Sequence, residues 1–248
     1  MTADPKILQE MTFAHGVSAR SLFDLEPVLF DRAWFSGERE KGDRDVYFMY
    51  REGFLSPGDH EVMRSNGIRF DITRIPAGCL GAEYVKTMGH YHPKTDGGTG
   101  RLSYPEVYQV ISGNAVYLMQ KRDMSEIIVI EARAGDVVLI PPEFGHVTIN
   151  ASDEELLMSN WVADTFASDY GTILENRGFA YYLTKTGLAA NPLYKKSGTP
   201  LPRVSFMTPG DHPGFGLFCG EDMYGLIRTP EKLAFLRAPE LFFPQTEK

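Results

Sequence analysis

The feature that most constrains the fold is a succession of short β-rich segments that begins near Asp45. Valine, isoleucine, tyrosine and phenylalanine recur in these segments with partial alternation, and turn-forming residues separate one segment from the next. The segments read DVYFMYRE, IRFDITRI, EYVKTMGHYH, EVYQVISG, NAVYLMQK, EIIVIEA, DVVLIPP, HVTIN and LLMSNWVA. Many short strands at this spacing are typical of an antiparallel sandwich or barrel. We therefore predict an all-β domain.

Three histidines and a glutamate lie within this β-rich part of the chain: His90, His92, Glu106 and His146. A His-x-His pair on a strand sends both imidazoles to the same face, because side chains alternate with a period of two. Together with Glu106 and His146, the pair offers three nitrogens and one oxygen. Such a set suits iron, manganese, zinc, nickel or cobalt better than calcium or magnesium.

The spacing of these residues resembles the two-part motif of the cupin family. The first motif contains His-x-His, a glutamate and a glycine, and here six residues separate Glu106 from Gly113. The second motif is matched by Gly135, Pro141, His146 and Asn150. The resemblance implies a cupin double-stranded β-helix, a jelly-roll barrel with a metal inside.

Two features depart from the cupin motif. Glu143 stands where the second motif has glycine, and thirteen residues separate His92 from Glu106 where three or four are usual. Residues 94–104, KTDGGTGRLSY, contain three glycines and mixed polar residues. We interpret them as a surface loop inserted into a hairpin connection.

The chain on either side of the predicted barrel has a different character, although we expect one structural domain overall. Residues 1–44 are predicted to form a helical or extended arm that packs on the barrel, and residues 45–186 the cupin barrel with the metal site. Residues 187–248 are predicted to be a C-terminal extension with a short helix after Pro230. Because this extension is rich in proline and glycine, we expect no regular sheet there. Packing on its own barrel is favoured over a lid or an arm exchanged between subunits.

Composition limits the classes of partner. The net charge of −8 argues against nucleic acid. No uninterrupted apolar run is long enough to span a bilayer, and the first residues lack the basic and apolar regions of a signal peptide. With two cysteines, Cys79 and Cys219, a disulfide framework is not expected, and a cytoplasmic location is the default.

A closer resemblance comes from the residues around the histidines. The runs TRIPAG, EYVKTMGHYHPK, YPEVYQVISGNAVYLMQ, IPPEFGHVTIN and SDYGTI, together with SLFDLEPVLFDRAW near the N-terminus, resemble the cupin-type glucose-6-phosphate isomerases of archaea and some bacteria. The resemblance covers roughly residues 20–185. It implies an aldose–ketose isomerase that binds a sugar phosphate and pairs as a homodimer.

The resemblance also implies roles for individual residues. The metal ligands are expected to be His90, His92, Glu106 and His146, with Glu106 also the catalytic base. The expected substrate-binding residues are Thr73, Thr87, Gly89 and Tyr170 at the phosphate, and Tyr47 and Tyr108 at the sugar. Two positions depart from the family pattern, Ser168 in place of a histidine beside the substrate and Trp161 in place of a smaller aromatic residue.

The local sequence adds two expectations about the phosphate region. Lys86 is predicted to be a further donor to the phosphate, because it lies close to Thr87 in sequence. Thr87 has the opposite parity from His90, so a bulge or twist at Gly89 is needed for both to face one pocket.

The predicted reaction interconverts glucose 6-phosphate and fructose 6-phosphate with one divalent transition metal per chain. We expect Fe²⁺, with Mn²⁺, Zn²⁺ or Ni²⁺ as alternatives, and either proton transfer through a cis-enediol or a metal-assisted hydride shift. Alternative hypotheses for the function are a different cupin enzyme, such as a mannose-6-phosphate isomerase or an iron oxygenase, and a non-catalytic sugar-phosphate sensor.

Overall fold

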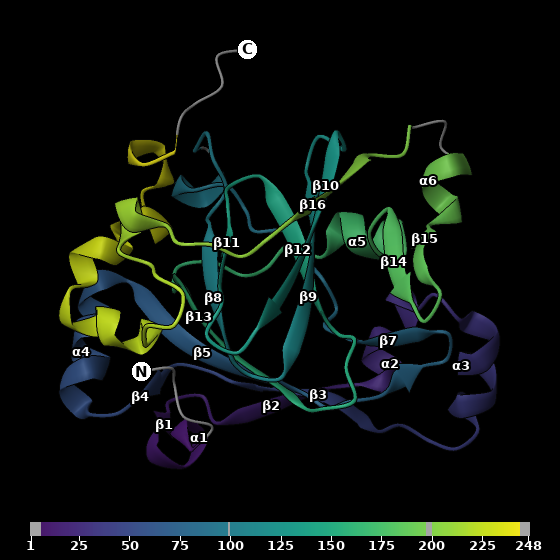
Figure 1. Ribbon diagram of the computed structural model, residues 1–248, viewed down its shortest axis with the longest axis horizontal. Helices are drawn as coiled ribbons and strands as arrows, with labels where there is room; N and C mark the ends of the chain where they lie inside the picture. Colours follow the sequence, from purple (N-terminus) through teal and green to yellow (C-terminus); the bar gives the residue numbers. More distant parts are fainter. Residues whose placement is uncertain (1–5, 99, 197–199, 244–248) are drawn as a thin grey trace.

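Two largely antiparallel sheets face each other and curl into a barrel in the computed structural model, which describes residues 6–98, 100–196 and 200–243 (Figure 1). The first sheet has the strand order β11-β8-β13-β5-β3-β2. The second has the order β15-β14-β7-β12-β9-β10-β16, with β6 also paired to β7. This is the cupin double-stranded β-helix, and the predicted fold class is confirmed.

The elements have the following bounds. The first sheet comprises β2 (Val17–Ser21), β3 (Asp45–Tyr50), β5 (Ile68–Ile75), β8 (Glu106–Ser112), β11 (Val137–Ile140) and β13 (Leu156–Ala163). The second comprises β6 (Cys79–Leu80), β7 (Glu83–Lys86), β9 (Asn114–Lys121), β10 (Glu126–Arg133), β12 (Phe144–Asn150), β14 (Tyr181–Thr184), β15 (Gly187–Ala190) and β16 (Arg203–Met207). A separate short pair joins β1 (Thr12–Phe13) to β4 (Gly53–Phe54).

The helices are short and lie outside the barrel. The α-helices are α1 (Ile7–Glu10), α2 (Leu22–Leu25), α3 (Arg32–Arg39), α4 (Pro57–Asn66), α5 (Gly171–Glu175) and α6 (Pro192–Lys196). The 3₁₀ helices are η1 (Glu26–Val28), η2 (Asp96–Gly98), η3 (Pro213–Phe215), η4 (Met223–Arg228), η5 (Pro230–Leu236) and η6 (Pro239–Leu241). Within the described residues, none of the helices has the length and apolar character needed to cross a membrane.

Alternation along the first sheet produces two hydrophobic cores. Inward-facing residues such as Val110 and Met158 pack in the barrel interior. Outward-facing residues such as Phe70 and Val107 pack in a second cluster with Leu233 and other residues of the C-terminal tail. Burying both faces explains why these strands alternate only partly between apolar and polar residues.

The C-terminal tail covers the outer face of the first sheet. Its 3₁₀ helices lie beside α4 at the left of Figure 1, and the helix predicted after Pro230 takes the form of η5. Leu233, Phe235 and Leu236 of η5 are fully buried. The indole Nε1 of Trp161 on β13 donates to the carbonyl of Met223 at 2.9 Å, which fastens η4 to the sheet.

One expectation for this extension is wrong, because part of it does continue a sheet. Strand β16 pairs in parallel with β10, from Glu126 opposite Arg203 to Ile130 opposite Met207. The neighbouring prolines lie outside the paired residues, so the ladder loses no N–H donor. As an edge strand, β16 needs hydrogen bonds on one side only.

Helix α4 was not predicted, although its ends carry clear signals. The Ser56 hydroxyl accepts a hydrogen bond from the Asp59 N–H, and Pro57 occupies the first turn. The helix ends at Gly67, which has a φ of 58° in the left-handed region. A serine–proline start and a glycine stop are typical helix boundaries. The helix is polar and lies between two segments with strong strand patterns, so apolar periodicity does not indicate a helix there.

The two departures from the cupin motif meet in space. Glu143 has a φ of 69°, a conformation that glycine adopts more readily. Its carboxylate accepts from the Ser103 N–H at 2.9 Å, and its own N–H donates to the Ser103 hydroxyl at 2.6 Å. Lys94 and Ser103 form the bridge that closes the inserted loop. The residue that replaces glycine therefore anchors the insertion, in which half of the described residues are exposed while Thr95 and Ser103 are buried.

Candidate metal centre and substrate pocket

The His-x-His segment continues the line of β7 but is not part of a regular strand. Strand β7 ends at Lys86, and Gly89 has a φ of 75°. The chain then pairs again at one residue, where His90 and His146 exchange backbone hydrogen bonds of 3.1 and 3.0 Å. The break at Gly89 brings Thr87 and His90 into one cavity, which confirms the irregularity predicted there.

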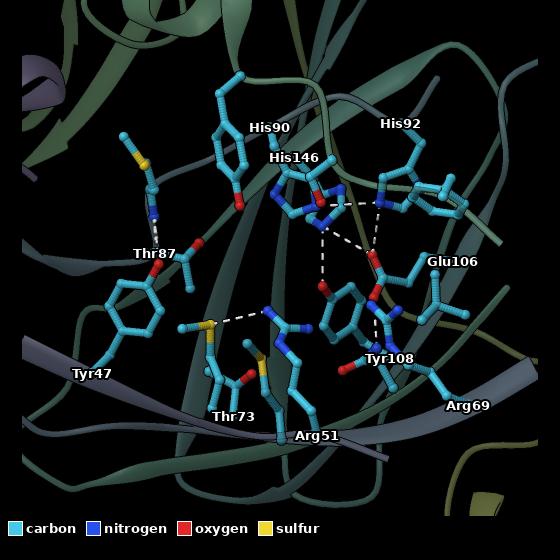
Figure 2. Close-up of a pocket in the computed structure, with 18 residues that line it drawn as sticks. Tyr47, Arg51, Arg69, Thr73, Thr87, His90, His92, Glu106, Tyr108 and His146 are labelled. Carbon is cyan, nitrogen blue, oxygen red and sulfur yellow. Dashed lines mark hydrogen bonds and ion pairs between the residues drawn. The ribbon is translucent and has the colours of Figure 1, made fainter. Parts of the chain in front are cut away.

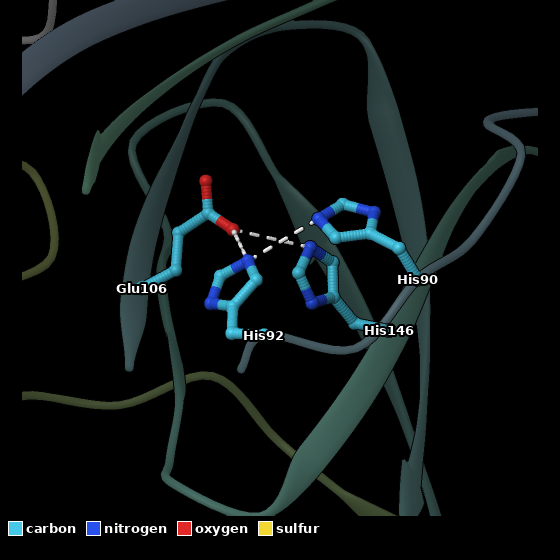
Figure 3. A group of neighbouring side chains, drawn as sticks. All are labelled: His90, His92, Glu106 and His146. Carbon is cyan, nitrogen blue, oxygen red and sulfur yellow. Dashed lines mark hydrogen bonds and ion pairs between the residues drawn. The ribbon is translucent and has the colours of Figure 1, made fainter. Parts of the chain in front are cut away.

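The four predicted ligands converge inside the barrel (Figure 3). Glu106 comes from the start of β8 in the first sheet, and His146 comes from β12 in the second. The Nε2 atoms of His90 and His92 are 3.2 Å apart. The Glu106 Oε2 atom lies 3.3 Å from His92 Nε2 and 3.2 Å from His146 Nε2.

Neighbouring groups orient these side chains toward a common point. The Nδ1 of His92 lies 2.8 Å from the carbonyl oxygen of Tyr104, so this nitrogen carries the proton and Nε2 presents a lone pair. The amide of Asn160 donates to Glu106 Oε1 at 2.6 Å and leaves Oε2 directed at the histidines. The Tyr108 hydroxyl lies 3.0 Å from His146 Nε2.

The environment favours the neutral forms of His90 and His146 and the ionised form of Glu106. Burial, together with His146 and His92, lowers the pKa of His90 well below its usual value. Burial also lowers the pKa of His146, although Glu106 opposes this shift. Burial alone would raise the pKa of Glu106, but its contacts with His146 and His92 hold it well below the usual range. At neutral pH, His90 and His146 are therefore uncharged and Glu106 carries a negative charge.

This cluster fits a divalent transition metal. Its four ligand atoms lie within 4.8 Å of one another, as a common ion would require. Glu106 Oε2 is buried, and among the described residues no hydrogen bond satisfies it. A buried carboxylate oxygen of this kind needs a positive partner. Three nitrogens and one oxygen match the preferences of iron, manganese, zinc and nickel.

We call His90, His92, Glu106 and His146 the metal cluster. A cavity extends from these side chains to the side of the barrel lined by Tyr47, Thr73 and Thr87 (Figure 2). Tyr170 and Ser168 also line it, and the ring of Tyr170 lies 5.6 Å from the ring of His90. The Tyr47 hydroxyl accepts from the Met88 N–H at 3.3 Å. The five side chains to which the resemblance gives a role in substrate binding thus lie in the same cavity, and Gly89 lies in the segment that forms its wall.

One expectation about the pocket is wrong. Lys86 does not line it, because this residue faces away from Thr87 and its Nζ contacts Glu83 at 2.6 Å and the Val28 carbonyl at 2.8 Å. Trp161, which departs from the family pattern, does not line the pocket either. It lies on the outer face of β13 under the tail, so its size has no direct effect on the pocket.

Sequence reasoning missed three polar residues that line the cavity: Arg51, Arg69 and Asn160. Their parity was a usable signal. Arg69 lies four residues before Thr73 on β5, and Arg51 lies four residues after Tyr47 at the end of β3, so strand alternation places them on the pocket side. In the sequence, however, both arginines fit the pattern of ordinary polar residues on half-exposed strands.

The sequence profile described as Glucose-6-phosphate isomerase (GPI) matches residues 19–200, most of the chain. The glucose-6-phosphate isomerase of Thermococcus litoralis is 30% identical over 163 residues, which are 66% of this chain and 77% of that protein. The chain belongs to the glucose-6-phosphate isomerase family. The isomerase of Pyrococcus furiosus is 29% identical over 184 residues, which are 72% of this chain and 88% of that one. A solved structure of Bacillus subtilis oxalate decarboxylase has a TM-score of 0.36 at 22% identity, over 50% of this chain and 28% of its own.

The match to the glucose-6-phosphate isomerase family includes the entire pocket. All the residues that line the cavity, from Tyr47 to Tyr170, lie inside the matched range. Most of the tail that covers the outer face of the first sheet lies beyond it.

Proposed function

We propose that this chain is a metal-dependent aldose–ketose isomerase that interconverts glucose 6-phosphate and fructose 6-phosphate. The observation that carries the proposal is the convergence of three imidazoles and one buried carboxylate in the cavity of a member of this family. Hydroxyl groups on the other side of the same cavity provide hydrogen-bond donors for a phosphate.

The proposed substrate orientation follows from the two ends of the cavity. Thr73, Thr87 and Tyr170, with the backbone at Gly89, hold the phosphate by neutral hydrogen bonds. A Cβ at Gly89 would lie 3.3 Å from both Phe179 and Val147, so only glycine leaves this backbone undisturbed. Carbons 1 and 2 of the open-chain sugar then lie next to Glu106.

Glu106 is proposed to move the carbon-bound proton. It takes the proton from carbon 2 of the aldose, the electron pair forms the carbon 1–carbon 2 double bond, and the aldehyde oxygen takes up the negative charge. The hydroxyl proton of oxygen 2 moves to oxygen 1, and return of the first proton from Glu106 to carbon 1 leaves the carbonyl at carbon 2, which completes the ketose. A bound divalent ion would act as a Lewis acid that stabilises negative charge on the sugar oxygens.

Other groups near Glu106 support this role. Asn160 holds the carboxylate in position through Oε1. Burial and the charge of Glu106 raise the pKa of Tyr108 well above its usual value, so its hydroxyl stays protonated and donates to a sugar oxygen. The alternative route is a hydride shift between the two carbons, in which Glu106 serves mainly as a ligand.

The experiment that tests the function is conversion of fructose 6-phosphate to glucose 6-phosphate before and after EDTA, with Fe²⁺, Mn²⁺, Zn²⁺ and Ni²⁺ added back separately. We expect activity to be lost on chelation and restored by one or more ions, with Fe²⁺ the first candidate. Metal bound at one per chain without turnover by any ion would contradict the proposal and favour another cupin activity or a sensor.

Two finer features have their own tests. In D₂O, proton transfer places deuterium on carbon 2 of the glucose 6-phosphate formed, whereas a hydride shift leaves hydrogen there. We also propose a homodimer, which a monomeric mass in sedimentation would contradict.

A further inference from the structure

Two arginines share one buried aspartate at the floor of the cavity, beside the metal cluster. Arg51 Nη1 donates to Asp71 Oδ2 at 2.8 Å, and Arg69 Nε donates to the same oxygen at 2.9 Å. The other carboxylate oxygen accepts from the Glu52 N–H at 2.9 Å. Both arginines line the cavity, while the Asp71 side chain is only 3% exposed.

The register of the two strands explains this arrangement. Met49 on β3 pairs with Thr73 on β5, so the next inward-facing positions toward the same end are 51 and 71. Arg69 follows Asp71 on the same face of β5. The row of inward residues thus runs from the hydroxyl groups proposed to bind the phosphate to two guanidinium groups.

Two guanidinium groups share the single charge of Asp71, and the other nearby carboxylates lie on the side of Arg69. Arg69 has a second acidic neighbour, Asp164, at 3.9 Å, and lies beside Glu106 in Figure 2. Arg51 differs, because its Nη2 points at the sulfur of Met49 at 3.2 Å, and a thioether is a weak acceptor. Figure 2 shows its guanidinium between Thr73 and Tyr108, facing the metal ligands across the cavity.

We propose that Arg51, held by Asp71, forms an anion-binding subsite for the carbon 1–carbon 2 end of the substrate. This inference rests on the proposed function and names a group that acts beside the metal. A fixed guanidinium fork is suited to two adjacent oxygens that share a negative charge. In the isomerase reaction that charge develops on the oxygen of carbon 1 as the carbon 2 proton leaves.

The same geometry defines a class of ligand. A six-carbon sugar-acid phosphate carries a carboxylate at carbon 1, where the reacting sugar develops its charge. The subsite therefore favours 6-phosphogluconate over glucitol 6-phosphate, which has the same length and phosphate but a neutral alcohol at carbon 1. A charge-assisted hydrogen bond corresponds to a preference of roughly tenfold or more.

The test is to measure the affinity of the full chain for these two ligands by calorimetry, as isolated and again after EDTA. Chelation separates the arginine contribution from that of a bound metal. We expect the wild-type protein to prefer the carboxylate in both states. Arg51→Gln should lose most of that preference in the chelated protein while keeping its affinity for glucitol 6-phosphate. Arg51→Lys should fall between them, because it keeps the charge but not the fork.

Arg74→Gln is the matched control. Arg74 lies on the outward face of β5, pairs with Glu155 at 3.1 Å, and should leave the preference unchanged when replaced. An unchanged preference in Arg51→Gln, or an equal loss of affinity for both ligands, would overturn the subsite while the isomerase proposal stands. Failure of the wild-type protein to bind either ligand would overturn both. If Arg51→Gln does not fold, Arg51→Lys decides the same comparison.

Discussion

The two oxygens of the Glu106 carboxylate have different surroundings. One oxygen holds the side chain in position, and the other is free to act on the metal or the substrate. Oε1 accepts the hydrogen bond of Asn160, whereas Oε2 faces the three imidazoles. Replacing the carboxylate by an amide keeps the shape of the side chain and removes both its charge and its basicity.

We predict that Glu106→Gln lowers kcat by roughly 10²–10⁴, the usual contribution of a general base. Steady-state assays at saturating metal, with the metal content of each variant measured in parallel, test this. Glu155→Gln serves as control, because that carboxylate is half exposed and pairs with Arg74 far from the cavity. A Glu106→Gln protein that retains its metal and most of its turnover would show that Glu106 is a ligand and not the base.

At the scale of residues, the sequence was sufficient wherever a motif fixed both type and spacing. His90, His92, Glu106 and His146 were identifiable because four positions matched two linked patterns, and the structure brings them together. Arg51 and Lys86 show the limit. Neither belongs to the motif, and their directions depend on where a strand ends or turns. Sequence proximity placed Lys86 at the phosphate, whereas its side chain turns away from Thr87 and contacts Glu83.

The element that links the site to the rest of the molecule is the first sheet, in which β8, β13 and β5 have functional residues on one face and a hydrophobic core on the other. Glu106 and Asn160 face the cavity, while their neighbours Val107 and Trp161 pack under the tail. The tail therefore packs against the strands that carry Glu106 and Asn160, and none of its described residues lines the cavity.

We predict that Phe235→Ala lowers the free energy of unfolding by about 3–5 kcal/mol, the usual cost of removing a buried phenylalanine. Phe235 is fully buried and its ring lies 4.4 Å from that of Phe215. Denaturant unfolding measures the change. Leu241→Ala is the control, because this residue of the same tail is 81% exposed and its loss should change stability by less than about 0.5 kcal/mol. Equal effects of the two substitutions would mean that the tail is not part of the cooperative core.

Elements were predictable where apolar periodicity was strong and not where pairing was decided at long range. The strands of the barrel were apparent from composition and turns. Strand β16 was not, because its partner β10 lies more than 70 residues earlier in the chain and its flanking prolines suggested irregular structure. The bond from Thr95 to Glu240, at 2.6 Å, is another contact between distant segments that no local pattern signals.

In the molecule as a whole, the metal cluster joins the two sheets. Glu106 belongs to β8 of the first sheet, whereas His146 belongs to β12 of the second and is bridged to His90. In the unfolded chain these side chains are separated by long flexible segments and do not form a preorganised site. An ion that binds the folded chain and not the unfolded chain must therefore stabilise the fold by mass action.

We predict that the metal-loaded protein unfolds at a higher temperature than the EDTA-treated protein. At an ion concentration of 100 times Kd the gain is about 2.7 kcal/mol, which for a chain of this size corresponds to a rise in Tm of roughly 5–10 °C. Differential scanning calorimetry across a metal titration measures it. His146→Ala should lose the shift, and His15→Ala should keep it, because His15 is an exposed histidine that pairs with Glu52 outside the cluster. A metal-dependent shift of the same size in His146→Ala would place the stabilising ion elsewhere and separate metal binding from the closure of the two sheets.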